Sequence, residues 1–196
     1  MQPGSPSLTY SSRMQPAAPA AAGRVLSMVK SLYIAAFAVA VGAPGLTAVT
    51  MFATHKAGAY MAWRTAFDLF PFAALLGGVC WLGMLVLALV WLHAAWSALP
   101  PSERRTRSGR EVTPGAAVGL LFVPFFNVYW MFVVSLGLCD AIDQRLERAG
   151  AVTRVPRGFA IGAILVPMLP FVGLFAPVLW FLFMRGVERA QAEALP

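Results

Sequence analysis

Four stretches of the chain are rich in apolar residues and contain no Asp, Glu, Lys or Arg. They are Ser31–His55, Leu69–Ser102, Val112–Cys139 and Gly158–Met184. The hydrocarbon core of a bilayer is about 30 Å thick, and roughly 20 apolar residues of helix cross it. Each stretch is long enough, so the pattern predicts an all-α, polytopic membrane protein with about four transmembrane helices. We place the spans near residues 31–53, 70–96, 115–138 and 159–184.

The composition indicates that lipid is the solvent for much of the surface. Of the 196 residues, 59% are hydrophobic and 12% are charged, whereas soluble domains average about 45–50% apolar and about 25% charged residues. The net charge of +7 would also suit nucleic acid. The basic residues, however, lie in short segments beside apolar stretches, where anionic headgroups are the nearer partner. We therefore expect the lipid bilayer as a partner and no nucleic acid.

The predicted domain organisation is simple. Residues 1–28 are rich in Pro, Ala, Ser and Gly and cannot bury a core, so they are expected to form a disordered tail. Residues 29–196 then form one helical transmembrane domain. Gly42–Gly45, with Pro44 inside, predicts a kink in the first span. A cleaved signal peptide is the alternative for this span if translation starts at Met28, because small residues follow a short apolar run.

Prolines mark two predicted helix starts, since proline fits the first turn of a helix. Pro71 opens the second span after a connection over Thr54–Asp68, and Pro114 opens the third, with Thr113 as its N-cap. The third helix is expected to continue beyond the membrane to Ala149 as an amphipathic segment. Its polar face would carry Asp140, Asp143, Gln144, Glu147 and Arg148. Its apolar face would carry Leu138, Cys139, Ile142, Leu146 and Ala149.

The third apolar stretch holds the packing candidates. Gly115 and Gly119 have the GxxxG spacing that lets two membrane helices approach closely. Pro124 interrupts the helix. Asn127 is the one Asn of the chain, and in an apolar environment its side chain needs a partner. We expect it to form a hydrogen bond between helices, for example to a carbonyl freed by Pro124; contact with a ligand is the alternative.

An arginine-rich loop separates the second and third spans. Its candidates for facing lipid headgroups are Arg104, Arg105, Arg107 and Arg110. Lys and Arg are enriched in cytoplasmic loops. With four spans, the side that holds this loop and both termini carries more Lys and Arg than the other, which favours that side as the cytoplasmic one. The loop that follows the third span opposes this orientation with Arg145, Arg148, Arg154 and Arg157.

Groups suited to catalysis are scarce. The chain contains no Walker loop, HExxH, GxSxG or CxxC motif. Cys80 and Cys139 lie in or beside apolar stretches and are interpreted as small hydrophobes. We therefore assign no catalytic, cofactor-binding or metal-ligating residue and expect no cofactor. Asp140, Asp143 and Glu147 form the one acidic cluster. It would suit Mg²⁺ in a lipid-modifying enzyme, although a solvated polar helix face is the favoured interpretation.

The segment from Val112 to Trp130 reads VTPGAAVGLLFVPFFNVYW. It resembles a motif of uncharacterised bacterial multi-span membrane proteins of the domain-of-unknown-function type, TPG-x-AVG-x-x-F-VP-F-x-N-x-Y. The matching residues are Thr113, Pro114, Gly115, Ala117, Val118, Gly119, Phe122, Val123, Pro124, Phe125, Asn127 and Tyr129. The resemblance implies a multi-span membrane domain. It implies no activity. We expect the protein to be multi-pass in a bacterial inner (plasma) membrane.

Three functions fit these features of the sequence. A non-enzymatic integral membrane protein, packing with itself or with a membrane-protein partner, fits the GxxxG spacing, Asn127 and the lack of catalytic groups. A small transporter or channel component fits the interrupted helices around Pro44, Pro124 and Pro167–Pro170, although charged groups are absent from the centres of the spans. A metal-dependent lipid-modifying enzyme would need the acidic cluster. We favour the first function.

Overall fold

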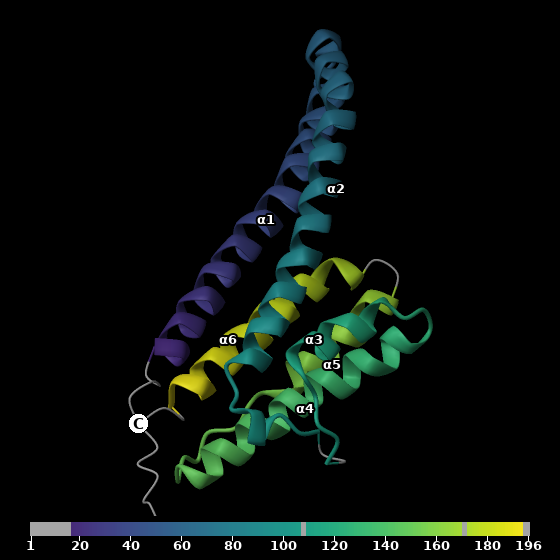
Figure 1. Ribbon diagram of the computed structural model, residues 1–196. Coiled ribbons are helices and arrows are strands. Elements are labelled where there is room, and N and C mark those ends of the chain that lie inside the picture. Colours follow the sequence, from purple (N-terminus) through teal and green to yellow (C-terminus); the bar gives the residue numbers. More distant parts are fainter. Residues whose placement is uncertain (1–16, 107–108, 170–171, 194–196) are drawn as a thin grey trace, which may run out of the picture.

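The computed structural model describes residues 17–106, 109–169 and 172–193 (Figure 1). Within these ranges every regular element is helical, apart from an isolated β-bridge between Arg105 and Glu111. The predicted all-α fold is confirmed. Three of the described helices are long and apolar enough to cross a membrane, namely α1 (Ala17–Lys56), α2 (Tyr60–Ser97) and α4 (Phe126–Arg148).

Helices α1 and α2 form a long antiparallel hairpin (Figure 1). Their connection is short, and Gly58 within it has a φ of +68°, a conformation that glycine adopts at little cost. At 1.5 Å per residue each helix is about 60 Å long, which exceeds the thickness of a hydrocarbon core. Only 11% of the apolar window of either helix is buried inside the protein. Lipid is therefore the solvent that suits this surface.

The boundaries of the hairpin differ from those predicted. Helix α1 begins at Ala17, inside the predicted tail, because alanine-rich sequence is the strongest helix former; residues 1–16 lie outside the described residues. The helix also continues through Pro44. Helix α2 begins at Tyr60 rather than at Pro71, so the predicted connection over Thr54–Asp68 is largely helical. Membrane helices tolerate such internal prolines when neighbouring groups satisfy the freed backbone.

The third apolar stretch starts as predicted but does not continue as one helix. After η1 (Pro101–Glu103), helix α3 (Pro114–Gly119) opens with Pro114 in its first turn, and the Thr113 hydroxyl accepts a hydrogen bond of 3.2 Å from the amide of Ala116. A 3-10 turn, η2 (Leu120–Phe122), follows. The chain then reverses, with Val123 extended and Phe125 at a φ of 61°. Helix α4 runs back beside η2, so the predicted continuous span over 115–138 is wrong.

The fourth stretch is also divided. It consists of α5 (Arg157–Leu165), η3 (Val166–Met168), η4 (Val172–Phe175) and α6 (Ala176–Glu193). Helix α5 packs against α6, and a Cβ added at Gly162 would lie 3.2 Å from the side chain of Leu179. The predicted single span over 159–184 is therefore two helices folded against each other. Residues 170 and 171 lie outside the described ranges.

Helix α6 connects the hairpin to the rest of the protein, as it lies beside the N-terminal part of α1 and also packs against α4 and α5 (Figure 1). An aromatic core fixes it to α2. The ring of Trp91 meets those of Trp180 and Phe183 edge-on, with centroid separations of 6.1 and 5.7 Å. Trp91 and Phe183 are fully buried. These contacts join α2 to α6.

Candidate functional site at the charged end

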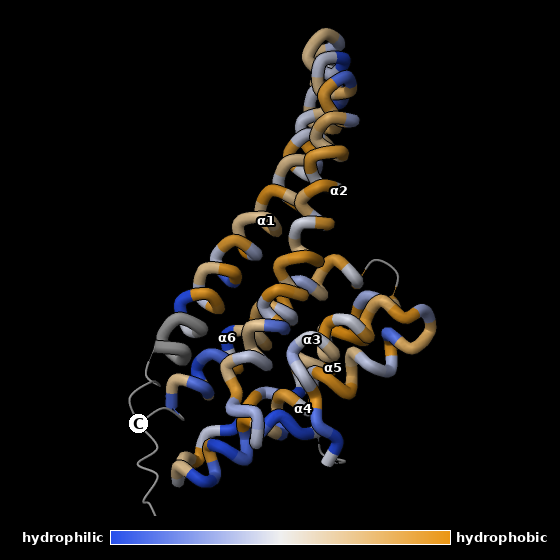
Figure 2. The backbone as a smooth tube through the Cα atoms, in the orientation of Figure 1, coloured by the Kyte–Doolittle hydropathy of each residue, from blue (hydrophilic) through white to orange (hydrophobic). Residues whose placement is uncertain are grey.

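The hydrophilic residues gather mainly at the end of the molecule away from the α1–α2 turn (Figure 2). Lys56, Arg64 and Asp68 lie near the α1–α2 turn. All other charged residues that the structure describes lie in four segments, residues 24–30, 103–111, 140–157 and 185–193. Ion pairs and packing bring these segments together, and we call this part of the molecule the charged end.

Two ion pairs join segments that are distant in sequence. Lys30 of α1 pairs with Glu188 of α6. Arg148 at the end of α4 pairs with Glu103 ahead of α3, with 2.8 Å between Nη1 and Oε1. One straight helix over residues 115–138 would hold the flanking segments about 35 Å apart. The second pair therefore places the two connections around α3–α4 at the same end of the molecule.

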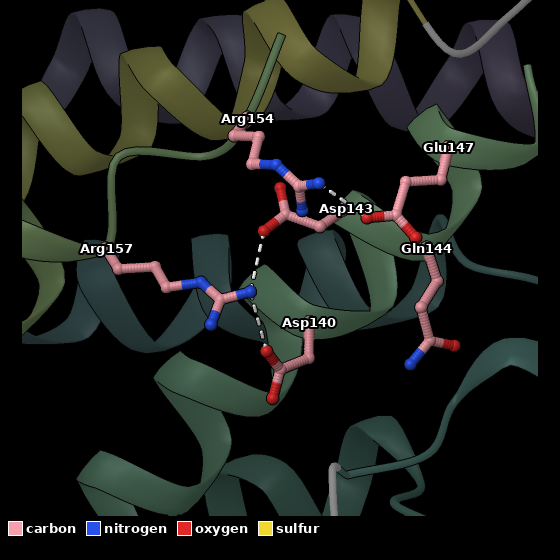
Figure 3. Close-up of a pocket in the computed structure, with 6 residues that line it drawn as sticks. All are labelled: Asp140, Asp143, Gln144, Glu147, Arg154 and Arg157. Atoms are coloured by element: carbon pink, nitrogen blue, oxygen red, sulfur yellow. Dashed lines mark hydrogen bonds and ion pairs between the residues drawn. The ribbon is translucent and has the colours of Figure 1, made fainter. Parts of the chain in front are cut away.

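A polar pocket of about 210 Å³ opens at the charged end, between α4 and the segment that leads into α5 (Figure 3). The pocket contains the whole predicted acidic cluster and adds two arginines from later in the chain. Its lining residues are Asp140, Asp143, Gln144, Glu147, Arg154 and Arg157. The Gln144 side chain points away from both arginines (Figure 3).

Every carboxylate of this pocket is paired with an arginine (Figure 3). The Nη2 atom of Arg157 lies 2.9 Å from Asp140 and 2.8 Å from Asp143. Arg154 lies 2.8 Å from Glu147, where both side chains are more than half exposed. The sequence identified the three acids but not their partners, because the arginines lie in the following connection and not on the same helix.

Asp143 is the central residue of the pocket. Its side chain is buried, its Oδ2 accepts a hydrogen bond from Arg157, and its Oδ1 accepts one of 2.8 Å from the amide of Val155. The hydrogen bond to Asp143, helped by the charge of Asp140, raises the pKa of Arg157 above its ordinary value, so this guanidinium stays charged at any physiological pH. Asp143 therefore fastens the 151–157 connection onto α4.

The predicted amphipathic extension of α4 is present, with two corrections. Its buried residues include four of those predicted, Leu138, Cys139, Ile142 and Leu146. Ala149 is exposed instead of buried, because α4 ends at Arg148. Asp143 is buried instead of solvated, because Arg157 and Val155 satisfy its carboxylate.

The geometry does not favour a metal site. Among the residues that the structure describes, no group of three or more His, Cys, Asp or Glu side chains could hold a metal ion. A divalent cation in the pocket would have to displace Arg157 from Asp140 and Asp143. The arrangement instead allows an ionic clamp that fixes one segment of the chain to another.

The predicted headgroup-facing arginines have different roles. The side chain of Arg104 donates hydrogen bonds to the backbone carbonyls of Leu99 and Ser97, at 2.8 and 3.0 Å, and so caps the C-terminal end of α2. It is therefore a structural residue. The other three are Arg105 and Arg110, both exposed, and Arg107, which lies outside the described residues.

The predicted packing residues of the third stretch make few contacts. A Cβ added at Gly115 or Gly119 would meet nothing within 4 Å, so these glycines bring no two of the described helices together. Asn127 is exposed, and its Oδ1 accepts a hydrogen bond of 2.8 Å from the amide of Val128. The expected bond between helices is wrong. Pro124 lies in the turn itself, where its missing N–H leaves no donor to satisfy.

Close approaches occur at glycines that the sequence did not single out. A Cβ at Gly77 would lie 3.0 Å from the carbonyl oxygen of Ala40, where α1 and α2 meet. A Cβ at Gly186 would lie 2.5 Å from the ring of Pro156. Nothing in the local sequence distinguishes these positions, because the neighbour that makes each one tight comes from another element.

A repeated spacing does mark the two reversals. Gly115, Gly119 and Val123-Pro124 form a GxxxGxxxVP pattern, which recurs as Gly158, Gly162 and Val166-Pro167. In the structure each copy is a short α-helix that tightens into a 3-10 turn, after which the chain folds back. This repeat is the sequence signal that distinguishes the third and fourth apolar stretches from the first two.

Aromatic side chains surround the opposite end of the α1–α2 hairpin. A pocket of about 320 Å³ there is lined by Thr54, His55, Gly58, Tyr60 and Trp63. The Trp63 ring lies 5.9 Å from His55 and 6.1 Å from Tyr60, measured between centroids. Such rings beside Lys56 suit the boundary between hydrocarbon and headgroups.

No protein-family model, no curated protein and no solved structure matches the chain. The chemistry of the chain is therefore inferred from its own residues. Those residues provide paired carboxylates, a capped helix end and a large apolar surface.

Proposed function

We propose that the chain is a non-enzymatic integral membrane protein with a packing or accessory role. The observation that carries this proposal is the closed ionic clamp of the charged end. The acidic pocket of α4 has its carboxylates paired with Arg154 and Arg157, so a metal ion or a proton would have to compete with these arginines there. The extensive apolar surface of α1 and α2 supports a role inside the bilayer.

The proposal includes a topology. Helices α1 and α2 cross the membrane, whereas α3–α4 and α5–α6 enter from the charged end and return to it. The charged end lies in the cytoplasm, because it collects all the described Lys and Arg residues except Lys56 and Arg64, and such residues are retained on the cytoplasmic side. This arrangement removes the conflict of a four-span topology, in which the two arginine-rich connections would lie on opposite sides. The resemblance to bacterial multi-span proteins supports an inner-membrane location.

The apolar surface of the α1–α2 hairpin supports an accessory role. Only 11% of its apolar windows is buried inside the protein, compared with 56% for α4. A second copy or another membrane protein would pack on this surface in place of lipid. Membrane helices associate through packing and not through a hydrophobic driving force, so such partners bind in the bilayer and are lost in harsh detergent.

A transporter or channel component is the second candidate, and the interrupted segments at 120–126 and 166–175 favour it. Reconstitution into proteoliposomes separates the two functions. The proposal predicts that fluxes of small ions, amino acids and sugars equal those of empty vesicles, while cross-linking in native membranes yields a defined dimer or a defined membrane partner. A solute flux above that of empty vesicles, with no cross-linked species, would favour transport instead.

A further inference from the structure

The turn between α3 and α4 exposes large aromatic side chains. We define the α3–α4 tip as residues 120–129. Within it Phe122, Phe125 and Tyr129 are 71%, 98% and 61% exposed. In water such exposure of neighbouring apolar rings is unfavourable. In hydrocarbon the same surface is well solvated.

The position of the tip suits hydrocarbon. About 20 Å of helix separates Phe126, at the start of α4, from Asp140, the first charged residue of that helix. A hydrocarbon core is about 30 Å thick. With Asp140 at the membrane surface, the tip would therefore end inside the bilayer and not reach the opposite headgroups.

Irregular backbone inside a bilayer is costly unless its polar groups have partners. The tip provides several of these partners itself. Its amide donors bond within the tip as Val123 to the Leu120 carbonyl, Phe126 to the Pro124 carbonyl, Asn127 to the Val123 carbonyl, and Val128 to the Asn127 side chain. Pro124 has no amide hydrogen to satisfy. These bonds give Asn127 a role, since its Oδ1 accepts from an amide in the first turn of α4 that has no partner within the helix.

We propose that the α3–α4 tip is a lipid-inserting anchor whose partner is the acyl-chain region of the bilayer. Phe122, Phe125 and Tyr129 contact the acyl chains, and Asn127 closes the backbone of the turn. The proposal rests on the topology given above, in which α3–α4 enters from the charged end. The second GxxxGxxxVP copy, ahead of the turn between α5 and α6, supports it independently, because Leu165, Met168 and Leu169 beside that turn are also exposed.

Depth-dependent fluorescence quenching tests the anchor. Single cysteines replace Phe125 or Phe122 in a background carrying Cys80→Ala and Cys139→Ala, and each carries an environment-sensitive dye. The matched control is Val152→Cys, since Val152 is an equally exposed apolar residue, at 95%, but lies at the charged end. The protein is reconstituted in vesicles of phosphatidylcholine and phosphatidylglycerol. The quenchers are nitroxide groups on the lipid acyl chains and aqueous iodide.

The anchor predicts that acyl-chain nitroxides quench the dyes at Phe125 and Phe122 several-fold more strongly than the dye at Val152, and that iodide shows the reverse order. Iodide quenching at Phe125 and Phe122 equal to that at Val152 would overturn the proposal. Labelling of Ser102→Cys and Thr153→Cys from each side of the same vesicles tests the topology separately from the anchor. If both label from one side while Phe125 is quenched by iodide, the topology holds and the anchor alone fails. If they label from opposite sides, the topology fails and the anchor with it.

Discussion

The indole Nε1 of Trp130 donates a hydrogen bond of 3.1 Å to the backbone carbonyl of Ala117, and both residues are buried. In one straight helix these two residues, 13 positions apart, would be separated by about 20 Å along the axis. The bond therefore holds α3 and α4 side by side as a hairpin.

Replacing Trp130 by Phe tests the contribution of this bond. An aromatic ring remains at this position, but the buried Ala117 carbonyl loses its indole donor and the smaller ring leaves some space unfilled. We expect the free energy of unfolding, measured by denaturant titration in lipid–detergent micelles, to fall by about 1–3 kcal/mol. Trp63→Phe at the α1–α2 turn is the control and should change it by less than about 0.5 kcal/mol. Equal effects of the two substitutions would mean that the indole bond does not stabilise the hairpin.

Asp143→Ala should destabilise the protein more than Glu147→Ala. Asp143 is buried, and its loss leaves the Val155 amide without an acceptor, which costs about 1–3 kcal/mol. Glu147 and Arg154 form a pair whose side chains are 56% and 64% exposed, and such pairs contribute about 0–1 kcal/mol. The same denaturant titration measures both variants. If Glu147→Ala proved as costly as Asp143→Ala, the clamp would not be centred on Asp143.

Two glycine substitutions should differ in their effect on stability. Gly186→Ala places a methyl group 2.5 Å from the rigid ring of Pro156, so we expect a loss of about 1–3 kcal/mol. The methyl group of Gly119→Ala would meet nothing within 4 Å, and the backbone of Gly119 is helical. This substitution should therefore be neutral or should stabilise the protein by up to about 1 kcal/mol. Destabilisation by Gly119→Ala alone would point to a tightly packed partner at the GxxxG face.

Divalent cations should not change the thermal stability of the protein. Because arginines occupy Asp140, Asp143 and Glu147, millimolar Mg²⁺ should not raise the thermal unfolding temperature above that seen with an equal ionic strength of NaCl. A Mg²⁺-specific increase that disappears in Asp143→Asn would revive the interpretation of the acidic pocket as a metal-dependent lipid-modifying site.

Hydropathy identified the apolar, charge-free segments but not the direction in which each one runs. Ser31–His55 and Val112–Cys139 are both free of charge and long enough to span, yet the first lies within one helix and the second reverses at Val123–Phe125. The absence of charged residues indicates an apolar environment. That environment is the same whether the stretch crosses a bilayer or turns back within it. The reversal depends on Pro124 and on the left-handed backbone of Phe125, a conformation that phenylalanine rarely adopts.

The candidate site was predictable only in part. The acids of α4 share a face because of helical spacing, which the sequence gives directly. Their partners Arg154 and Arg157 are brought to them by the connection that follows α4, and Glu103 is brought to Arg148 by the reversal at the tip. Such contacts depend on tertiary structure, so local patterns cannot supply them. The repeat of GxxxGxxxVP is the one local signal for both reversals.

The topology is tested most directly at Ala57, Ser102 and Thr153. Each is replaced by cysteine in the background lacking Cys80 and Cys139, and a membrane-impermeant maleimide is applied to intact and to opened cells. We predict that Ala57→Cys reacts in intact cells, while Ser102→Cys and Thr153→Cys both react only after opening. The four-span alternative places Thr153 on the same side as Ala57. Reaction of Thr153→Cys in intact cells, with Ser102→Cys protected, would therefore contradict the account that both apolar stretches fold back to the charged end.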